Sequence, residues 1–129
     1  MTNKKTITGL KINSFSRSME YVEIDKTKGL IDYYKAISSP AKEVNIIEKV
    51  DLDINGYFCE KSNRFTNELW IDEDGLFVNP IQQRFFIFEG RFYAGNGVIL
   101  MADCYSGESL STMLTFRDIA LSGALAFPT

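Results

Sequence analysis

The sequence predicts an α+β fold: a single small domain with an antiparallel or mixed sheet, one main helix on one face of it and a short C-terminal helix. Two observations support this prediction. Segments in which apolar and polar residues alternate occur in both halves of the chain, whereas helical spacing is confined to two short segments. The length of 129 residues is that of one domain, residues 1–129, and it is sufficient to bury a hydrophobic core.

An antiparallel strand pair is predicted at the beginning of the chain. Ile7, Leu10 and Ile12 alternate with polar residues in KTITGLKINSF, although Gly9 disturbs the period. The segment MEYVEID, residues 19–25, alternates more regularly. The turn-rich residues SFSRS lie between the two segments and are expected to connect them.

The main helix is predicted in the segment DKTKGLIDYYKAISSP. Asp25 or Thr27 could cap its amino terminus, and Pro40 follows the helix breakers Ser38 and Ser39. A helix of two to three turns, packed on the sheet, is therefore expected. Its apolar residues fall at helical spacing: Leu30, Ile31, Tyr34 and Ile37.

The middle of the chain is predicted to return to strands. Residues 43–54 have β character, and Asn55-Gly56 after them suits a type I′ hairpin turn, because both central residues of that turn need a positive φ. The segment YFCEKSNRFTN leads out of this turn as a short return strand or a polar loop. The segments ELWI and LFV are predicted as short strands on either side of a second hairpin signal, Asp74-Gly75.

The last third is predicted to hold the centre of the sheet and the second helix. Residues 85–88 form a buried or edge segment, and residues 98–103 form the most apolar strand, expected at the centre. The preceding AGNG lacks the lysine and the following helix of a phosphate-binding loop, so a tight turn is favoured. Thr115 and Asp118 have the spacing of a capping box, with Asp in place of Glu or Gln, and predict a short helix.

Composition excludes several kinds of function. A net charge of −3 and a pI near 5.0 disfavour general binding to nucleic acid, and no direct nucleic-acid partner is expected. The absence of histidine removes Ser-His and Cys-His pairs, and the two cysteines, Cys59 and Cys104, do not suffice for the usual zinc sites. Two free thiols are expected, and a disulfide between Cys59 and Cys104 is the alternative. No metal, cofactor or membrane span is expected, and without an apolar leader the predicted location is cytoplasmic.

The acidic run Asp72, Glu73 and Asp74 is the first candidate site. Counted from Asp72, the fifth and sixth positions are Leu76 and Phe77, so the run is not an EF-hand loop. Adjacent carboxylates in a tight turn point apart and stay solvated, which does not suit paired acid–base catalysis. The ordinary interpretation is a solvated hairpin tip, and the functional alternative is an acidic tip that recognises a protein partner.

Arginine and aromatic residues form the second candidate site. Guanidinium groups bind phosphate and rings stack on bases, so Arg84, Phe86, Arg91 and Tyr93 could hold a nucleotide-like small molecule. In a strand, however, Arg84 and Phe86 lie on one face and Phe85 on the other. Packing in the core or at a sheet edge is therefore the ordinary interpretation of these residues.

Four motifs resemble an uncharacterised family of short proteins, a domain of unknown function common in phages and mobile elements. They are YYKAI, EVNII, LWIDEDGLFVNP and FYAGNGVILMADCYSGESLS, in this order between Leu30 and about Ile119. The resemblance implies an accessory protein of a phage or mobile element with no established catalytic residues. It supplies no functional residue that could be transferred to this chain.

These observations predict a small non-enzymatic protein that acts by binding. The first hypothesis is that it binds a host protein in the cytoplasm of the host cell, as an anti-defence inhibitor or adaptor, through its acidic hairpin. The alternative is that it binds or sequesters a nucleotide-like signal. A homo-oligomer is expected in either case, because a short β-rich domain leaves sheet edges to be covered.

Overall fold

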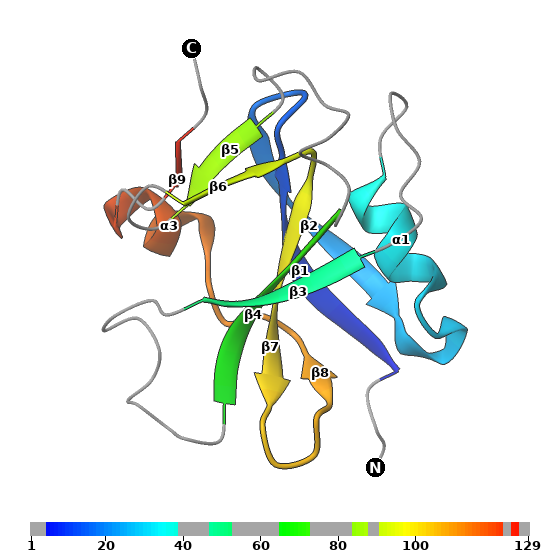
Figure 1. Ribbon diagram of the computed structural model, residues 1–129. Coiled ribbons are helices and arrows are strands. Elements are labelled where there is room, and N and C mark those ends of the chain that lie inside the picture. Colours follow the sequence, from blue (N-terminus) through cyan, green and yellow to red (C-terminus); the bar gives the residue numbers. More distant parts are fainter. Residues whose placement is uncertain are drawn as a thin grey trace.

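The computed structural model describes residues 5–38, 47–52, 65–72, 84–87, 91–122 and 125–126 (Figure 1). In chain order the elements are β1 (Thr6–Asn13), β2 (Ser18–Asp25), the 3-10 turn η1 (Lys26–Lys28), α1 (Ile31–Ile37), β3 (Ile47–Leu52), β4 (Phe65–Asp72), β5 (Arg84–Ile87), β6 (Arg91–Ala94), β7 (Gly97–Asp103), β8 (Ser109–Leu110), α3 (Phe116–Ser122) and β9 (Leu125–Ala126).

The main sheet has the strand order β2-β1-β7-β4-β3, and the short β8 also pairs with β7. A smaller sheet has the order β6-β5-β9. Every pairing between the described strands is antiparallel. The predicted α+β class is therefore confirmed, with an antiparallel sheet, a main helix and a short C-terminal helix. The apolar β7 lies at the centre of the main sheet, as predicted.

The predicted amino-terminal strand pair is also confirmed. β1 and β2 pair from Thr6 with Asp25 to Asn13 with Ser18, so residues 14–17 form the connecting turn. The Asn13 side chain accepts hydrogen bonds from the backbone N–H groups of Phe15 and Ser16, each at 3.0 Å. This local acceptor stabilises the turn, as Asn and Asp side chains commonly do.

Gly9 in β1 is required by the packing of the sheet. A Cβ at this position would lie 2.6 Å from Cγ1 of Val98 and 3.0 Å from Cδ2 of Leu100, which are both on β7. The disturbance of the apolar period at Gly9 therefore marks a close approach between β1 and two buried side chains.

The helix α1 has seven residues, which is the lower end of the predicted two to three turns, but it is capped differently than predicted. It has no side-chain cap at Leu30, because Asp25 caps the preceding turn η1 instead: its side chain accepts the backbone N–H of Thr27. α1 ends at Ile37, and the predicted stop signal Pro40 lies outside the described residues. Tyr33 and Ile37 form its buried side.

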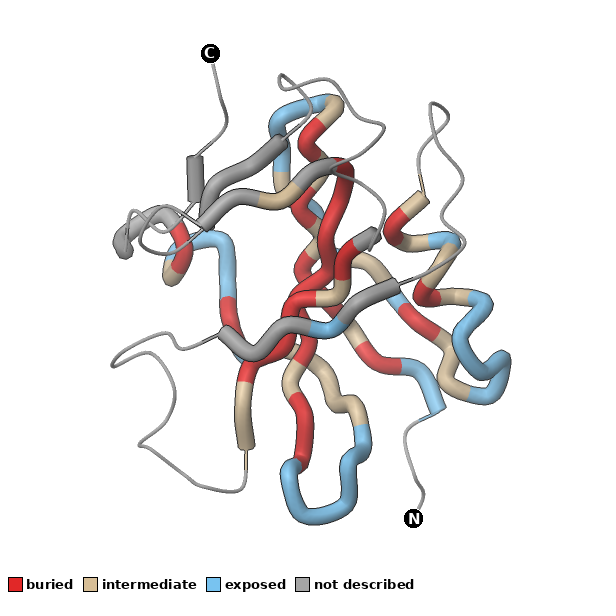
Figure 2. The backbone as a smooth tube through the Cα atoms, viewed as in Figure 1, coloured by how far each residue is buried: buried red, intermediate tan, exposed pale blue. Residues whose placement is uncertain are grey.

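The buried residues are concentrated in the central strands of the main sheet (Figure 2), and they form two clusters, one on each face. Strand alternation sends neighbouring residues to opposite faces, so each central strand contributes to both clusters. The cluster on the α1 side consists of Ile7, Ile24, Tyr33, Ile37, Val98 and Leu100. The cluster on the α3 side consists of Leu10, Ile12, Leu69, Ile71, Ile99, Leu114 and Ile119.

The structure describes part of the strands predicted for the middle of the chain. β3 pairs with β4 so that Leu52 lies opposite Asn67. The hairpin turn predicted at Asn55-Gly56 stays a prediction. The two residues of the turn lie outside the described part of the chain, as does Cys59. The predicted strand ELWI is real but longer, since β4 runs to Asp72.

The segment between β6 and β7 is a bend and not the predicted tight turn. β6 belongs to the small sheet and β7 to the main sheet, so the chain passes from one sheet to the other at Gly95 and Asn96. Gly95 has φ 80°, a conformation that favours glycine. Ser14 holds this bend: its backbone N–H donates to Asn96 Oδ1 at 3.1 Å, and its hydroxyl donates to the Gly95 carbonyl.

The predicted capping box of the C-terminal helix is confirmed. The Asp118 backbone N–H donates to Thr115 Oγ1 at 3.1 Å, and the Thr115 N–H donates to Asp118 Oδ2 at 3.0 Å. An Asp side chain therefore completes a box in which Glu or Gln is usual. The short strands β6, β8 and β9 were not predicted from the sequence.

Candidate functional site

The strand β2 forms one edge of the main sheet. It pairs with β1 along its whole length, and no described strand pairs with its other side. An edge strand presents unpaired N–H and C=O groups that another chain can pair with. The side chains of β2 alternate between the two faces: Met19 packs against the α3-side cluster, and Val22 packs against the α1-side cluster.

An exposed aromatic pair lies on the α3 side of this edge. The rings of Tyr21 on β2 and Phe116 at the start of α3 are stacked, with centroids 4.5 Å apart and an interplanar angle of 19°. Tyr21 remains 47% exposed and Phe116 39% exposed. We call these two residues the aromatic stack. Met113, which is 60% exposed, precedes Phe116 in the same connection.

The connection between β8 and α3 holds Phe116 in this position. The backbone N–H of Thr112 donates to the Thr8 carbonyl at 2.9 Å, and the Thr8 N–H donates to Ser111 Oγ at 2.9 Å. Two residues further along, Leu114 is buried in the α3-side cluster. The capping box then fixes the start of the helix at Phe116. The position of the Phe116 ring is therefore fixed both by the connection that precedes it and by the capping box at the start of α3.

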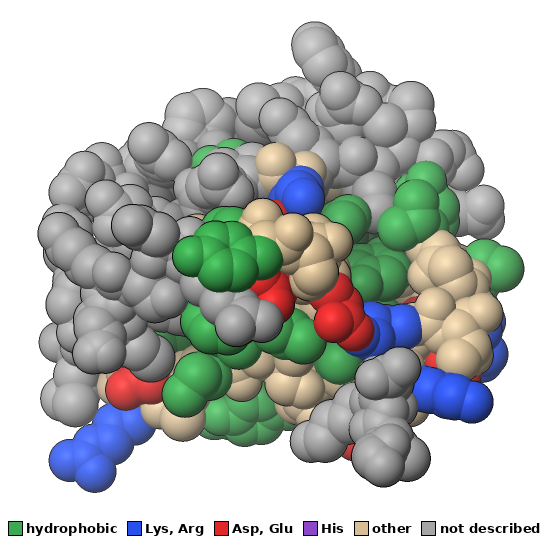
Figure 3. All heavy atoms as spheres, turned by 90° about the horizontal axis from the view of Figure 1, so that it is seen from below, with side chains coloured by type: hydrophobic (Ala, Val, Ile, Leu, Met, Phe, Trp, Pro, Cys, Tyr) green, Lys and Arg blue, Asp and Glu red, His purple; other side chains and the backbone are tan. Residues whose placement is uncertain are grey.

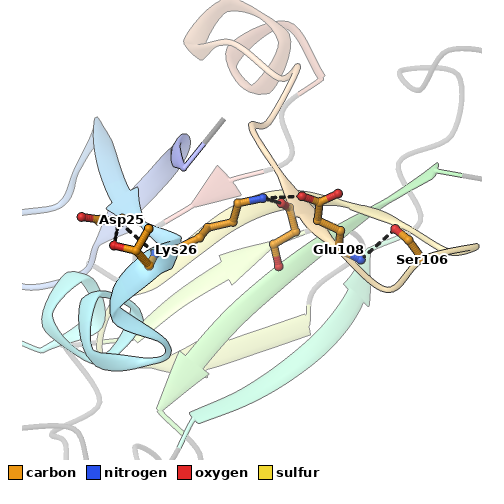
Figure 4. A network of polar contacts seen from close by, with 6 residues as sticks. Asp25, Lys26, Ser106 and Glu108 are labelled. Atoms are coloured by element: carbon orange, nitrogen blue, oxygen red, sulfur yellow. Dashed lines mark hydrogen bonds and ion pairs between the residues drawn. The ribbon is translucent and has the colours of Figure 1, made fainter. Parts of the chain in front are cut away.

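An ion pair ties the β7–β8 turn to the end of β2 (Figure 4). Lys26 Nζ lies 2.7 Å from Glu108 Oε2 and donates to the Ser109 carbonyl at 3.1 Å. The Glu108 N–H donates to Ser106 Oγ at 3.2 Å within the β7–β8 turn. The base of the β1–β2 hairpin and this turn are thus held together.

The rest of the edge strand β2 carries three carboxylate side chains. Glu20 and Glu23 are exposed, and Asp25 ends the strand half-exposed. Hydrogen bonds from the hydroxyl and the backbone N–H of Thr27, at 2.6 and 2.9 Å, lower the pKa of Asp25 from its ordinary value of 3.8. Asp25 is therefore a structural cap, whereas Glu20 and Glu23 face solvent.

A second polar region lies on the α1 side, at the other edge of the sheet. Glu68 on β4 is 4% exposed and pairs with Lys49 on β3 at 3.1 Å. Lys49 Nζ also lies 5.7 Å from the centroid of the Trp70 ring, and that ring packs on Tyr33 at 4.7 Å. Within the described part of the chain, the buried indole N–H of Trp70 has no hydrogen-bond partner.

Figure 3 shows the face of the molecule that carries the β7–β8 turn, where hydrophobic, acidic and basic side chains are mixed. This turn holds the exposed Tyr105, which is 75% exposed, and Cys104, a free and exposed thiol. Among the residues that the structure describes, no group of His, Cys, Asp and Glu could hold a metal ion. No helix in the described ranges is long and apolar enough to cross a membrane.

The acidic residues predicted as a hairpin tip are only partly described. Asp72 is the last residue of β4 and lies opposite Ile47 on β3. Its backbone is thus part of the sheet and not of a turn. Glu73 and Asp74 lie outside the described residues. The role of this run in partner binding stays a prediction.

The four residues predicted for a nucleotide-like ligand lie on the β5–β6 pair. Arg84 and Phe86 lie opposite Ala94 and Phe92, whereas Arg91 and Tyr93 lie opposite Ile87 and Phe85. Strand alternation therefore places these four positions as two pairs on opposite faces of the hairpin. Tyr93 packs against the α3-side cluster. The ordinary interpretation, core packing, is the one that applies to Tyr93.

The aromatic stack was not identified as a site from the sequence. Tyr21 could be assigned to either face of its strand, and Phe116 follows the capping residue Thr115 without any motif around it. The signal available in the sequence was Phe116, an aromatic residue in the first turn of a short helix. It could not be paired with Tyr21 because 95 positions separate them in the sequence.

No protein-family model matches this sequence, and no curated protein or solved structure is significantly similar to it.

Proposed function

We propose that this chain acts by binding a protein partner and that the aromatic stack is the contact. One observation carries the proposal: Tyr21 and Phe116 are stacked on each other beside a sheet edge while 47% and 39% of their surfaces remain exposed. Two aromatic rings that a structure holds in solvent offer apolar area to a partner without a large loss of side-chain entropy.

The surroundings of the stack fit an interface. Aromatic residues and Met are enriched in protein interfaces, and the exposed Met113 lies in the same connection as Phe116. The rings are held by the sheet below and by the capping box beside them, so the surface is formed before a partner arrives. Preformed aromatic residues of this kind are the ones that dominate binding energy in many interfaces.

The proposal keeps the biology that the sequence motifs imply. The protein would be an accessory protein of a phage or mobile element that binds a host protein, as an anti-defence inhibitor or adaptor, in the host cytoplasm. Its support is the order of the motifs quoted above. The described parts of these motifs include residues of α1 and β7, two elements of the core.

Site-specific photocrosslinking tests the proposal. The photoreactive residue p-benzoylphenylalanine replaces Tyr21 in one variant and, as a matched control, Tyr105 in another, because Tyr105 is also an exposed tyrosine. Each variant is irradiated in a lysate of bacterial host cells, with and without Phe116→Ala. We expect one discrete protein adduct at position 21 that is absent at position 105 and weakened by Phe116→Ala.

The outcomes separate the alternatives. Adducts of equal yield at both positions, or an adduct at position 21 that Phe116→Ala leaves unchanged, would contradict the role of the stack. A discrete protein that is lost only when Asp72, Glu73 and Asp74 are changed to alanine would move the contact to the acidic run. Crosslinks to nucleic acid alone would contradict a protein partner.

A further inference from the structure

We propose that the partner binds as an added strand on the edge of β2 that no described strand covers, and that its pairing segment is extended and basic. The inference rests on the proposed function, because it specifies how a protein would meet the aromatic stack. An extended segment that joins a sheet edge gains main-chain hydrogen bonds, and its alternate side chains supply specificity.

The geometry of the edge suits this mode of binding. β2 has eight residues in regular register with β1, from Ser18 to Asp25, and no other described strand pairs with it. The Asp25 backbone N–H already donates to Asp32 Oδ2 at 2.9 Å, so an added strand would pair with residues 18–24. A strand of this length could pair with a segment of the usual strand length. The aromatic stack lies on one face of the sheet at the middle of the edge, so a side chain opposite Tyr21 would meet both rings.

The negative charge of β2 indicates what kind of segment would pair with it. Within Ser18–Asp25 there are three carboxylates, at Glu20, Glu23 and Asp25, and no basic residue. Glu20 and Glu23 are exposed. Lys26, which follows the strand, already pairs with Glu108 at 2.7 Å. The exposed Arg17 precedes the strand, and Lys11 on β1 lies opposite Glu20. Opposite charges on directly opposed strand residues stabilise a pairing and like charges destabilise it, so a basic segment is favoured.

The same charges disfavour a second copy of this chain as the occupant. Each copy would bring Glu20, Glu23 and Asp25 to the shared edge with no basic residue within β2 to balance them, so two β2 strands placed side by side would bring like charges together. The homo-oligomer expected from the sequence would then need another surface, such as the edge strand β3.

The register predicts a pattern for the partner. Tyr21 and Glu23 lie on the α3 side of the sheet, and Glu20 lies on the other side. An antiparallel partner would therefore carry a basic residue opposite Glu23, any residue next, an apolar residue opposite Tyr21 and a basic residue opposite Glu20. The pattern is basic-x-apolar-basic from the amino to the carboxyl end.

Peptide binding to the full chain tests this inference. The probe is the capped peptide Thr-Val-Lys-Val-Phe-Lys-Val-Thr with a fluorescent label, and the matched control has Glu in place of both Lys residues. We expect the Lys peptide to bind about tenfold more tightly than the Glu peptide. The double variant Glu20→Lys and Glu23→Lys should reverse this preference, and Tyr21→Ala should weaken both.

Two backbone-blocked peptides test the strand pairing itself. One carries N-methyl groups on alternate residues, and the other carries them on the remaining residues. In an added strand only one set of N–H groups points at β2. One N-methylated peptide should therefore lose binding and the other should keep it. Equal binding of both would show that the contact is made by side chains alone and would overturn strand addition.

The remaining outcomes distinguish this inference from the proposed function. If no peptide binds while a protein is still crosslinked at position 21, the protein partner stands and the added basic strand is wrong. A dimer of the wild-type chain in analytical ultracentrifugation that Tyr21→Ala dissociates would instead identify a second copy as the occupant. A preference that the double charge reversal leaves unchanged would overturn the choice of a basic segment.

Discussion

Ser14 and Asn96 form a buried hydrogen bond across 82 positions of the sequence, from the backbone N–H of one to the side-chain oxygen of the other, at 3.1 Å. Both residues are 1% exposed. The bond connects the β1–β2 turn to the bend between β6 and β7. It lies at the point where the chain leaves one sheet for the other, so it holds the two sheets in their mutual arrangement.

Asn96→Ala is expected to destabilise the protein by about 1–3 kcal/mol, because the buried N–H of Ser14 would lose its acceptor. Urea unfolding followed by circular dichroism measures the change. The control is Ser106→Ala, which removes an exposed acceptor of a backbone N–H in the β7–β8 turn. A loss for Asn96→Ala no larger than for this control would contradict a structural role for the bond.

Gly9→Ala is expected to destabilise the protein by about 1–3 kcal/mol through overpacking against β7. The new Cβ would lie 2.6 Å from Cγ1 of Val98. Val98→Ala should therefore cost less stability in the Gly9→Ala background than in the wild type. A double-mutant cycle from thermal or urea unfolding measures this coupling. Additive effects of the two substitutions would show that the close approach is relieved elsewhere.

Asp25 is expected to make folding stability depend on pH in the acid range. Its pKa is lowered in the folded state by the two hydrogen bonds from Thr27. The stabilisation is therefore fully present above the pKa of the unfolded chain, near 3.8, and is lost as the pH falls through the lower folded value.

Asp25→Asn should remove this part of the pH dependence. Carbon NMR of the carboxyl group gives the folded pKa directly, and urea unfolding at several pH values compares the variant with the wild type. Thr27→Val, which deletes the hydroxyl donor, should raise the pKa of Asp25 towards its ordinary value. A pKa that does not move in Thr27→Val would assign the shift to another cause.

Two lysine ion pairs in the described part of the chain are expected to differ in strength. Lys49 pairs with Glu68, whose side chain is only 5% exposed, whereas Lys26 pairs with Glu108, whose side chain is 50% exposed. Lys49→Met should cost about 1–3 kcal/mol, because the buried Glu68 carboxylate would lose its ion pair with Lys49. Lys26→Met should cost less than about 1 kcal/mol. Equal losses, measured by urea unfolding at low and high salt, would contradict this ranking.

Local signals in the sequence predicted the elements that local interactions form. The β1–β2 pair has a short turn with its own side-chain acceptor, and the C-terminal helix has a capping box between Thr115 and Asp118. The apolar run in β7 predicted its central place, because a strand that is buried on both faces needs apolar residues throughout.

The remaining features depend on partners that are distant in the sequence. The pairing of Leu52 with Asn67 joins residues that are 15 positions apart, and no local signal in the sequence predicted this register. The glycine and asparagine before β7 looked like a turn, but Asn96 is held by Ser14 in a bend. The aromatic stack likewise joins residues whose proximity no local pattern encodes.

The order of strands in the main sheet has a consequence for synthesis on the ribosome. β1 is made first, but its neighbour β7 pairs Ile99 with Leu10 and Gly97 with Ile12. The β1–β2 hairpin must therefore wait for most of the chain to emerge before it gains its second neighbour. Pairings between such distant residues form slowly, and meanwhile the apolar side of the hairpin stays uncovered. A chaperone would therefore be most useful while the nascent β1–β2 hairpin still exposes its apolar side chains.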